Sequence, residues 1–234
     1  MGAILKPTSS IAEKASGVEV YRILSRSLNV DWREYVALVA DKVGGGYFPV
    51  LVGTILSQNT NDKNSIEAFM SLKSRVGVRI EDILRASVEE IGDAIRKAGL
   101  WRRKAETIKR VAEFIASRGG EEYLAREDPM RLREELLRVE GVGFKTIDVF
   151  LSLARRTPVF AVDTHAMRVA LRWGLASKRD YETVSRALLD FFGPDIAEEA
   201  HRLIIALGRR YCRARNPRCN ICPLTSLCPS SSKV

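Results

Sequence analysis

Apolar residues recur along most of this chain at the three- and four-residue spacing of an α-helix. Residues 18–43 follow the pattern and predict one or two helices. The stretch 47–58 is apolar on nearly every side, which predicts a buried central helix. Alternating apolar and polar positions, the mark of a β-strand, never extend beyond four residues. The sequence therefore predicts an all-α fold.

The same spacing predicts further helices, and glycine and proline mark the breaks between them. The predicted helices cover residues 63–76, 80–86, 88–98, 98–117, 130–138, 164–173, 181–192 and 195–210, with one more that begins near 145. Residues 121–127 are expected to be a link, and residues 1–17 a loose tail. Three consecutive glycines, Gly44 to Gly46, interrupt any helix and predict a crossing between domains.

The composition indicates a globular protein that binds a polyanion. The chain has 234 residues, of which 46% are hydrophobic, enough for one large or two small domains. Its 38 Lys and Arg against 29 Asp and Glu give a formal charge of +9. This excess suits nucleic acid, although ribosome-associated and membrane-surface proteins share it. No stretch has the roughly 20 apolar residues of a membrane span, and the N-terminus lacks a signal-peptide core. We therefore expect an intracellular protein without a membrane partner.

A glycine hairpin, Gly141-Val142-Gly143, separates two of the predicted helices. Alternate glycines permit backbone angles that other residues resist, and they leave amide groups bare at a helix N-terminus, where a phosphate can bind. Such turns are common, so the hairpin alone is weak support for phosphate binding. Lys145 follows in the first helical turn, where the helix dipole is expected to lower its pKa. It is either a solvated surface lysine or an amine kept partly neutral for nucleophilic attack.

Asp163 ends the apolar run that precedes the helix predicted at 164–173. A carboxylate at that place caps the next helix, and the chain could double back at Pro158 to bring it near Lys145. Asp163 can cap the helix and lie near Lys145 at the same time.

All four cysteines lie in one C-terminal segment with the spacing C-x6-C-x2-C-x5-C, at Cys212, Cys219, Cys222 and Cys228. This clustering excludes a dispersed disulfide framework and indicates a metal site. Zinc and a [4Fe-4S] cluster both accept four thiolates, but structural zinc more often pairs two short knuckles, so the spacing favours iron–sulfur. Arginines crowd the same segment, at Arg209, Arg210, Arg213, Arg215 and Arg218. They form a positive patch suited to DNA phosphates.

The run Gly141-Val142-Gly143-Phe144-Lys145-Thr146, with Val162-Asp163-Thr164-His165 and the cysteine spacing, resembles endonuclease III-type DNA glycosylases over roughly residues 18–228. The resemblance implies two helical domains, a helical barrel that contains the helix-hairpin-helix and an iron–sulfur domain, with DNA and the active site in the cleft between them. We expect a tail at 1–17, a discontinuous iron–sulfur domain at 18–43 and 157–234, and the other domain at 44–156, with the helix-hairpin-helix at about 134–156.

The activity implied by the resemblance is base-excision repair of double-stranded DNA that contains damaged bases or abasic sites. Lys145 would attack the sugar C1′ and allow strand cleavage by β-elimination, while Asp163 would stabilise positive charge on the sugar. A bifunctional glycosylase and abasic-site lyase acting as a monomer on oxidised pyrimidines, with a [4Fe-4S] cluster as cofactor, is the favoured function. A monofunctional mismatch-specific thymine or uracil glycosylase is the alternative, and a non-catalytic DNA-binding module a more remote one.

The resemblance also assigns DNA contacts. Gln58 would fill the space left by the extruded base, or the polar run around it would only cap two helices. Leu100 would wedge into the base stack, or pack as a hydrophobic staple at a helix start. The remaining contacts are Gly141, Gly143, His165, Arg213, Arg215 and Arg218. The neighbouring Arg102, Arg103 and Lys104 are either phosphate contacts or a solvated helix face.

Four positions depart from the family pattern. Leu-Pro usually precedes the glycines and Arg precedes the lysine, but this chain has Val139-Glu140 and Phe144. Asp148 stands where asparagine is common. We expect Glu140 to weaken or reorient DNA binding at the hairpin, and a second carboxylate at Asp148 to influence which base is accepted.

Overall fold

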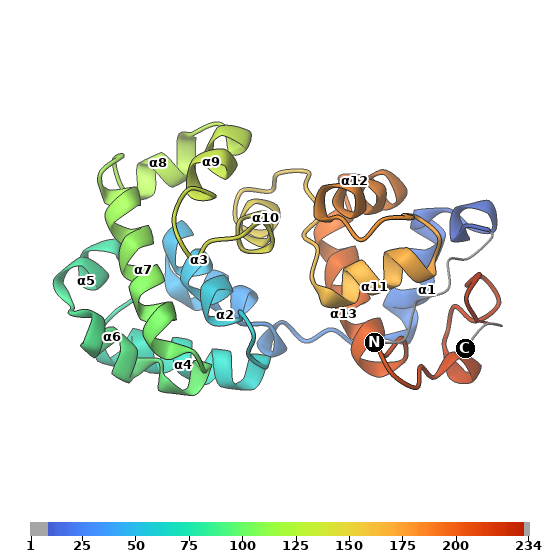
Figure 1. Cartoon of the computed structure of the whole chain (residues 1–234), viewed down its shortest axis with the longest axis horizontal. Helices are drawn as coiled ribbons and strands as arrows, with labels where there is room; N and C mark the ends of the chain where they lie inside the picture. Colours follow the sequence, from blue (N-terminus) through green and yellow to red (C-terminus); the bar gives the residue numbers. More distant parts are fainter. Residues whose placement is uncertain (1–8, 232–234) are drawn as a thin grey trace. The chain divides into compact units, whose positions relative to one another are not determined.

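The computed structural model describes residues 9–231, which form helices joined by loops (Figure 1). Those residues contain no β-strand, so the predicted all-α class is confirmed. The chain divides into two compact units. Unit 1 comprises Met1–Val30 and Pro158–Val234, and unit 2 comprises Asp31–Thr157. None of the helices in residues 9–231 is long and apolar enough to cross a membrane.

The predicted domain boundary at Gly44–Gly46 is wrong, because residues 31–43 belong to unit 2. Helix α2 (Val36–Gly44) packs against α3 (Tyr47–Leu56) across a very short distance. A side chain at Gly53 of α3 would place its Cβ 2.9 Å from the Cβ of Ala40. This close packing joins α2 to the core of unit 2 and leaves the glycines as a turn inside that unit.

The predicted loose tail is wrong for residues 9–17. Ser10 and Glu13 form a capping box around the short helix η1 (Ile11–Glu13). The Ile11 side chain is fully buried, and its backbone N–H donates to the Trp173 carbonyl oxygen at 2.8 Å. The remainder of the predicted tail, residues 1–8, lies outside the described residues.

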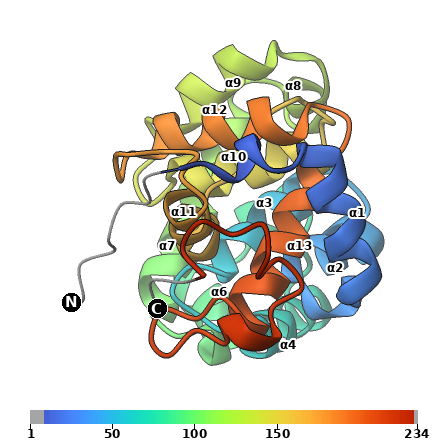
Figure 2. The ribbon, with the colours of Figure 1, turned by 90° about the vertical axis from the view of Figure 1, so that its right-hand side faces the viewer.

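Unit 1 is a small helical bundle built from both ends of the chain. Its helices are η1, α1 (Gly17–Ser27), α11 (Thr164–Arg172), α12 (Tyr181–Phe192), α13 (Ala197–Arg210) and η4 (Cys219–Ile221). Phe160, Trp173 and Phe192 lie in its buried aromatic core. The C-terminal segment that carries the cysteines follows α13 and is largely irregular (Figure 2).

Unit 2 is arranged around α3, whose residues 48–56 are all buried, as predicted for the central helix. Helices α2, α7 and α10 pack around it (Figure 1). The other elements are η2 (Trp32–Glu34), α4 (Asp62–Arg75), α5 (Ile80–Arg85), α6 (Val88–Ala94), η3 (Arg96–Ala98), α7 (Trp101–Ala116), α8 (Glu121–Arg126), α9 (Pro129–Leu136) and α10 (Phe144–Leu153).

The segment predicted as a link at 121–127 is instead a helix, α8, and its first residue caps the N-terminus of α3. The Glu121 carboxylate accepts hydrogen bonds from the backbone N–H groups of Tyr47 and Phe48, at 2.9 and 3.0 Å. These are orphan donors at the N-terminus of α3, where Gly46 offers no side-chain cap. A carboxylate there is also favoured by the helix dipole.

Candidate active site and cysteine centre

The hairpin between α9 and α10 uses its two glycines differently. Gly141 has φ +91, and a Cβ there would lie 2.2 Å from Thr107 Oγ1, so both its conformation and its packing require glycine. Gly143 has φ −122, and the expectation of an unusual conformation is wrong for it. It is the N-cap of α10 without a side-chain cap, and a Cβ there would meet nothing within 4 Å. The start of α10 therefore has open space beside Gly143, and the N-terminus of a helix suits an anion.

Lys145 is the second residue of α10 and is half-buried, which argues against a solvated surface lysine. Its Nζ donates to Ser57 Oγ at 3.0 Å. The Ser57 hydroxyl in turn donates its hydrogen to the Thr54 carbonyl oxygen at 2.7 Å. A lone pair of Ser57 is therefore fixed toward the amine, and the end of α3 sets where the Lys145 nitrogen lies.

Gln58 follows Ser57 at the same end of α3 and binds both sides of the hairpin. Its Nε2 donates to the Gly141 carbonyl oxygen and to Thr146 Oγ1, each at 3.1 Å. The structure thus brings Gln58, Lys145 and the glycine hairpin into one site within unit 2. Entry of Gln58 into a duplex, which stays a prediction, would exchange these two hydrogen bonds for contacts with a base.

Leu100 is 60% exposed, which argues against a hydrophobic staple. Its backbone is left-handed (φ 47), as is that of Gly99 (φ 61), an unfavourable state for a leucine. An exposed apolar side chain on a strained backbone fits the predicted wedge better than a packing role. The next residue, Trp101, anchors this loop, because its ring would lie 2.8 Å from a Cβ at Gly92.

The cations after Leu100 have three different environments. Arg103 is exposed, as either interpretation expected, and the Arg102 guanidinium lies 4.9 Å from the centre of the Trp101 ring. Lys104 is only 3% exposed. It is neither a phosphate contact nor part of a solvated face, so both interpretations are wrong for this lysine.

The departure at Asp148 does not place an isolated carboxylate in the site. Asp148 is buried and pairs with Arg133 of α9, with Nε–Oδ1 and Nη2–Oδ2 distances of 2.6 and 3.0 Å. The same guanidinium lies 4.8 Å from the centre of the Phe144 ring. Asp148 and Phe144 are thus linked through one arginine. The exposed Glu140 carboxylate lies 3.8 Å from Arg110.

Asp163 in unit 1 is the N-cap of α11, as its position predicted. Its Oδ1 accepts from the Ala166 N–H at 2.7 Å. The preceding residue is held as well, because the Val162 N–H donates to the Tyr181 hydroxyl at 3.2 Å. The hydrogen bond from Ala166 therefore fixes the carboxylate on its own helix through Oδ1, and Oδ2 takes no part in that bond.

His165 lies against α13 within unit 1. A Cβ at Gly208 would lie 2.3 Å from its Nδ1, so only glycine leaves room for the ring. Nδ1 is 2.9 Å from Arg168 Nη2, and because a guanidinium cannot accept, the histidine nitrogen must be the acceptor. Burial lowers the pKa of His165, the Asp163 carboxylate partly opposes this, and the charges of Arg168 and Arg209 lower the pKa further. A neutral ring follows, and its predicted contact with DNA stays a prediction.

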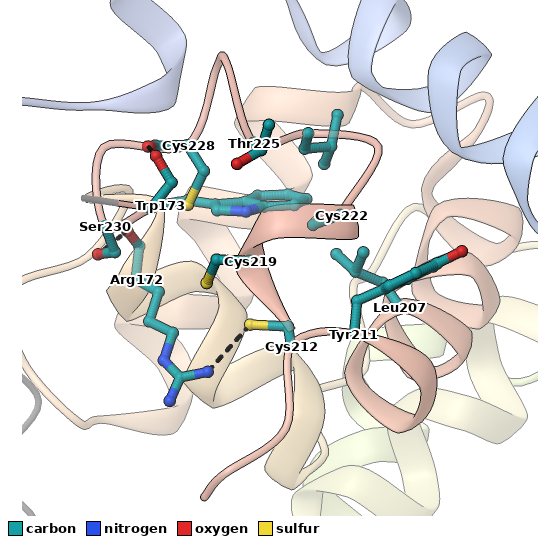
Figure 3. Close-up of a pocket in the computed structure, with 12 residues that line it drawn as sticks. Arg172, Trp173, Leu207, Tyr211, Cys212, Cys219, Cys222, Thr225, Cys228 and Ser230 are labelled. Atoms are coloured by element: carbon teal, nitrogen blue, oxygen red, sulfur yellow. Dashed lines mark hydrogen bonds between the residues drawn. The ribbon is translucent and has the colours of Figure 1, made fainter. Parts of the chain in front are cut away.

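The four cysteines line one pocket together with Arg172, Trp173 and Leu207 (Figure 3). Within residues 9–231 no three His, Cys, Asp or Glu side chains are arranged to hold a single metal ion. Four thiols that line one pocket supply the number and type of ligand that a [4Fe-4S] cluster takes. The donor set therefore fits a [4Fe-4S] cluster with Cys212, Cys219, Cys222 and Cys228 as ligands.

Burial raises the pKa of the Cys222 thiol to about 11 and also raises the pKa values of Cys219 and Cys228. Ligation requires thiolates, so the positive charge of bound metal must offset this cost. Arg172 assists from α11, because its Nη1 donates to Cys212 Sγ at 3.2 Å (Figure 3). A cluster held here would supply a rigid centre for the segment.

Two buried arginines of α11 fix the start of the cysteine segment. Arg168 Nε donates to the Cys212 carbonyl oxygen at 2.9 Å, and Arg172 Nη1 donates to that of Arg213 at 2.8 Å. With the backbone held, the arginine side chains of the segment point into solvent. Those exposed are Arg209, Arg210, Arg213, Arg215 and Arg218.

The sequence reasoning missed three residues that hold parts of these two sites: Ser57, Arg168 and Arg172. It named Lys104, but as a phosphate contact or a solvated residue and not as a buried one. The two arginines stand four residues apart on a helix with an otherwise apolar face. That spacing places both on one side and was a usable signal. No spacing or periodicity in the sequence indicated the contacts of Ser57 or Lys104.

Two family models match the chain. The model described as HhH-GPD superfamily base excision DNA repair protein matches residues 52–194, and the iron–sulfur binding domain of endonuclease III matches 212–228. Endonuclease III of Sulfolobus acidocaldarius is 35% identical over 212 residues, which cover 90% of this chain and 94% of that protein. Endonuclease III of Bacillus subtilis is 34% identical, with coverage of 80% and 82%.

Solved structures are similar as well. A non-covalent endonuclease III–DNA complex matches with a TM-score of 0.74 at 26% identity, covering 94% of this chain and 98% of that one. A thermostable thymine-DNA glycosylase has the same TM-score at 19% identity, covering 93% and 95%. The latter shows a shared fold alone. From the family models, the relatives and the cysteine centre, the chain belongs to the HhH-GPD superfamily of base excision DNA repair proteins, as an iron–sulfur DNA glycosylase of the endonuclease III type.

Proposed function

We propose that the chain is a bifunctional enzyme that releases damaged pyrimidines and then cleaves the strand, with Lys145 as nucleophile. The observation that carries the proposal is the placement of Lys145 Nζ, 3.0 Å from Ser57 Oγ at the open start of α10. A lysine on the first helical turn faces the positive end of the helix dipole, which favours the neutral amine. A neutral amine can attack carbon, whereas an ammonium ion cannot.

The reaction begins when the neutral Lys145 amine attacks the sugar C1′. The bond from C1′ to the base nitrogen breaks, and the base leaves with the bonding electrons and takes up a proton. Opening of the sugar ring converts the amine adduct into a Schiff base between Lys145 and C1′. Loss of a proton from C2′ then expels the 3′ phosphate, and water hydrolyses the Schiff base to restore the lysine.

Asp163 would contribute the negative charge that stabilises the sugar during base release. Cleavage of the bond between C1′ and the base develops positive charge on the sugar, which a fixed carboxylate stabilises. One Asp163 oxygen accepts from the Ala166 N–H at 2.7 Å, so the orientation of the group is set before substrate binds.

The substrate would be double-stranded DNA with an oxidised pyrimidine or an abasic site, bound by a monomer. The base must leave the stack because C1′ is inaccessible within it. Gln58 and Leu100 would enter the duplex from the ends of two neighbouring loops. The exposed arginines around the cysteine centre would hold phosphates.

A monofunctional thymine or uracil mismatch glycosylase is the second candidate. The thymine-DNA glycosylase structure matches with the same TM-score of 0.74 as the endonuclease III complex, so the fold does not choose between the two activities. Lys145 favours the bifunctional enzyme, because base release without strand cleavage needs no amine nucleophile.

Borohydride trapping on a duplex with one thymine glycol distinguishes these functions. Wild-type protein is expected to give a covalent protein–DNA adduct, and Lys145→Gln none, although Lys145→Gln should still bind the duplex. Duplexes with a G·T or G·U mismatch form the second arm. Base release from them without any adduct would contradict the proposal and assign the monofunctional activity.

A further inference from the structure

Lys104 of α7 is buried, yet it keeps a full set of hydrogen bonds. Its Nζ donates to the carbonyl oxygens of Leu56 and Ala98 and to Thr60 Oγ1, each at 2.7 Å. An ammonium group has three hydrogens and no acceptor, so all of its donors are used. None of these three partners is a carboxylate, and burial lowers the pKa of Lys104 to about 8.

The three acceptors lie in or directly beside the two loops that carry Gln58 and Leu100. Leu56 and Thr60 flank Gln58 at a distance of two residues each, and Ala98 precedes Leu100 by two. Thr60 adds a second link, because its one hydroxyl hydrogen can go to the Ala98 carbonyl oxygen or to that of Gln58. One ammonium thus joins the loop of residues 57–60 to the loop of residues 98–100.

Both loops contain residues in left-handed backbone conformations, at Asn59 (φ 50), Gly99 (φ 61) and Leu100 (φ 47). For Leu100, unlike a glycine or an asparagine, this conformation is strained and persists only where the surroundings hold it. A buried charge is a costly way to do this, since an apolar side chain of similar volume is often neutral or stabilising. A hydrophobic residue could not, however, bind two carbonyl groups and a hydroxyl at once.

We propose that Lys104 is a positioning residue for base extrusion, whose ammonium holds the Gln58 and Leu100 loops at a fixed separation so that both side chains enter the duplex together. This inference rests on the proposed insertion of Gln58 and Leu100. The role is distinct from that of Lys145, because Lys104 touches neither substrate nor the reacting atoms.

The chain provides a matched control in Lys109 on the same helix. Its Nζ also donates to three carbonyl oxygens, those of Ile83, Leu84 and Ala86, at 3.1, 2.6 and 2.8 Å. These acceptors lie at the end of α5 and away from both loops in sequence. Lys104→Met and Lys109→Met each remove one ammonium with three acceptors and keep the aliphatic stem, but Lys109 is only partly buried and its acceptors belong to neither loop.

The test uses a duplex with an uncleavable tetrahydrofuran abasic site and 2-aminopurine as the opposing base, whose fluorescence rises when it unstacks. Gln58→Ala and Leu100→Ala calibrate the signal. Lys104→Met should lower the fluorescence rise at saturating protein. In a second assay on a natural abasic site, which the enzyme can cleave, Lys104→Met should lower the ratio of duplex to single-strand cleavage by roughly tenfold. Lys109→Met should keep both values.

If both calibrating variants keep the wild-type signal, insertion by Gln58 and Leu100 fails, and the proposal for Lys104 fails with it. If they lose the signal while Lys104→Met keeps it, the Lys104 inference alone is overturned. Should Lys104→Met not fold, Lys104→Gln carries the test, because a glutamine amide is shorter and has two hydrogens, too few to bind the three acceptors at once. A wild-type signal and cleavage ratio in that variant would then overturn the inference.

Discussion

The hairpin site of unit 2 and the cysteine segment of unit 1 are held in opposite ways. The hairpin is fixed by the chain itself, through a positive-φ glycine, a hydrogen bond from Gln58 to the Gly141 carbonyl oxygen, and one from Lys145 to the Ser57 hydroxyl. Residues 211–231 form little regular structure beyond the three-residue turn Cys219–Ile221. Buried arginines fix where the segment starts, and the rest surrounds four thiols. The first region should survive without a cofactor, and the second should not.

The largest effect is expected from Cys222→Ser. Loss of one thiolate should remove the cluster, and with it the broad absorbance at about 400 nm. The arginines of the segment would lose their common scaffold, so affinity for duplex DNA should fall by roughly 10–100-fold. Absorbance, iron content and duplex binding measure this, with the exposed Ser226→Ala as control. A colourless wild-type protein that contains zinc would contradict the cluster assignment.

Gly141→Ala should be the most damaging single substitution in the hairpin. The residue has φ +91, and the new Cβ would lie 2.2 Å from Thr107 Oγ1. Conformational strain and the clash together should lower the free energy of unfolding by roughly 2–4 kcal/mol. Urea unfolding measures the loss. A change below about 0.5 kcal/mol would mean that the hairpin is not fixed by its own backbone.

A pH dependence should reveal the buried Lys104. Its pKa is lowered from 10.5 to about 8, so between these pH values the unfolded chain binds more protons than the folded one. Stability from this group therefore rises with pH through that window and is lost as pH falls through about 8. Between pH 7 and 9.5 the stability of wild type relative to Lys104→Met should rise, by on the order of 2 kcal/mol. Lys109→Met should keep the wild-type slope, and an equal slope in Lys104→Met would contradict burial of the charge.

The smallest effect on stability is expected from Gly143→Ala. The φ of −122 suits any residue, and the new methyl group meets open space. Unfolding free energy should change by less than about 1 kcal/mol. Duplex affinity should nevertheless fall severalfold, because the methyl group would occupy the space through which a phosphate approaches the N-terminus of α10. Unchanged affinity would remove Gly143 from the DNA contacts.

The sequence could predict the helices and the chemically distinctive residues. Apolar spacing located α3 and its burial, and the motif around Lys145, Asp163 and the cysteines stood out because few other functions need those residues at that spacing. The N-terminal boundary was wrong, because the contact of Ile11 with Trp173 joins residues distant along the chain. Such contacts leave no periodic trace in the sequence.

Partners of charged side chains were the least predictable feature. Lys104 follows two arginines, a pattern typical of a solvated face, yet it is buried against carbonyl groups contributed by α3 and η3. Asp148 was expected to act as a second carboxylate on the choice of base, and the sequence did not indicate its ion pair with Arg133. In both cases the deciding group comes from another helix, so only the packed structure identifies it.

The most direct test of the account is to map the borohydride-trapped adduct by mass spectrometry of its tryptic peptides. Two candidate amines lie within unit 2, Lys145 at the open start of α10 and Lys104 with its lowered pKa. The account predicts that the DNA-derived mass lies on Lys145 alone, and that Lys104→Met forms an adduct at the same residue. An adduct on Lys104 or on the N-terminal amine would contradict Lys145 as the nucleophile.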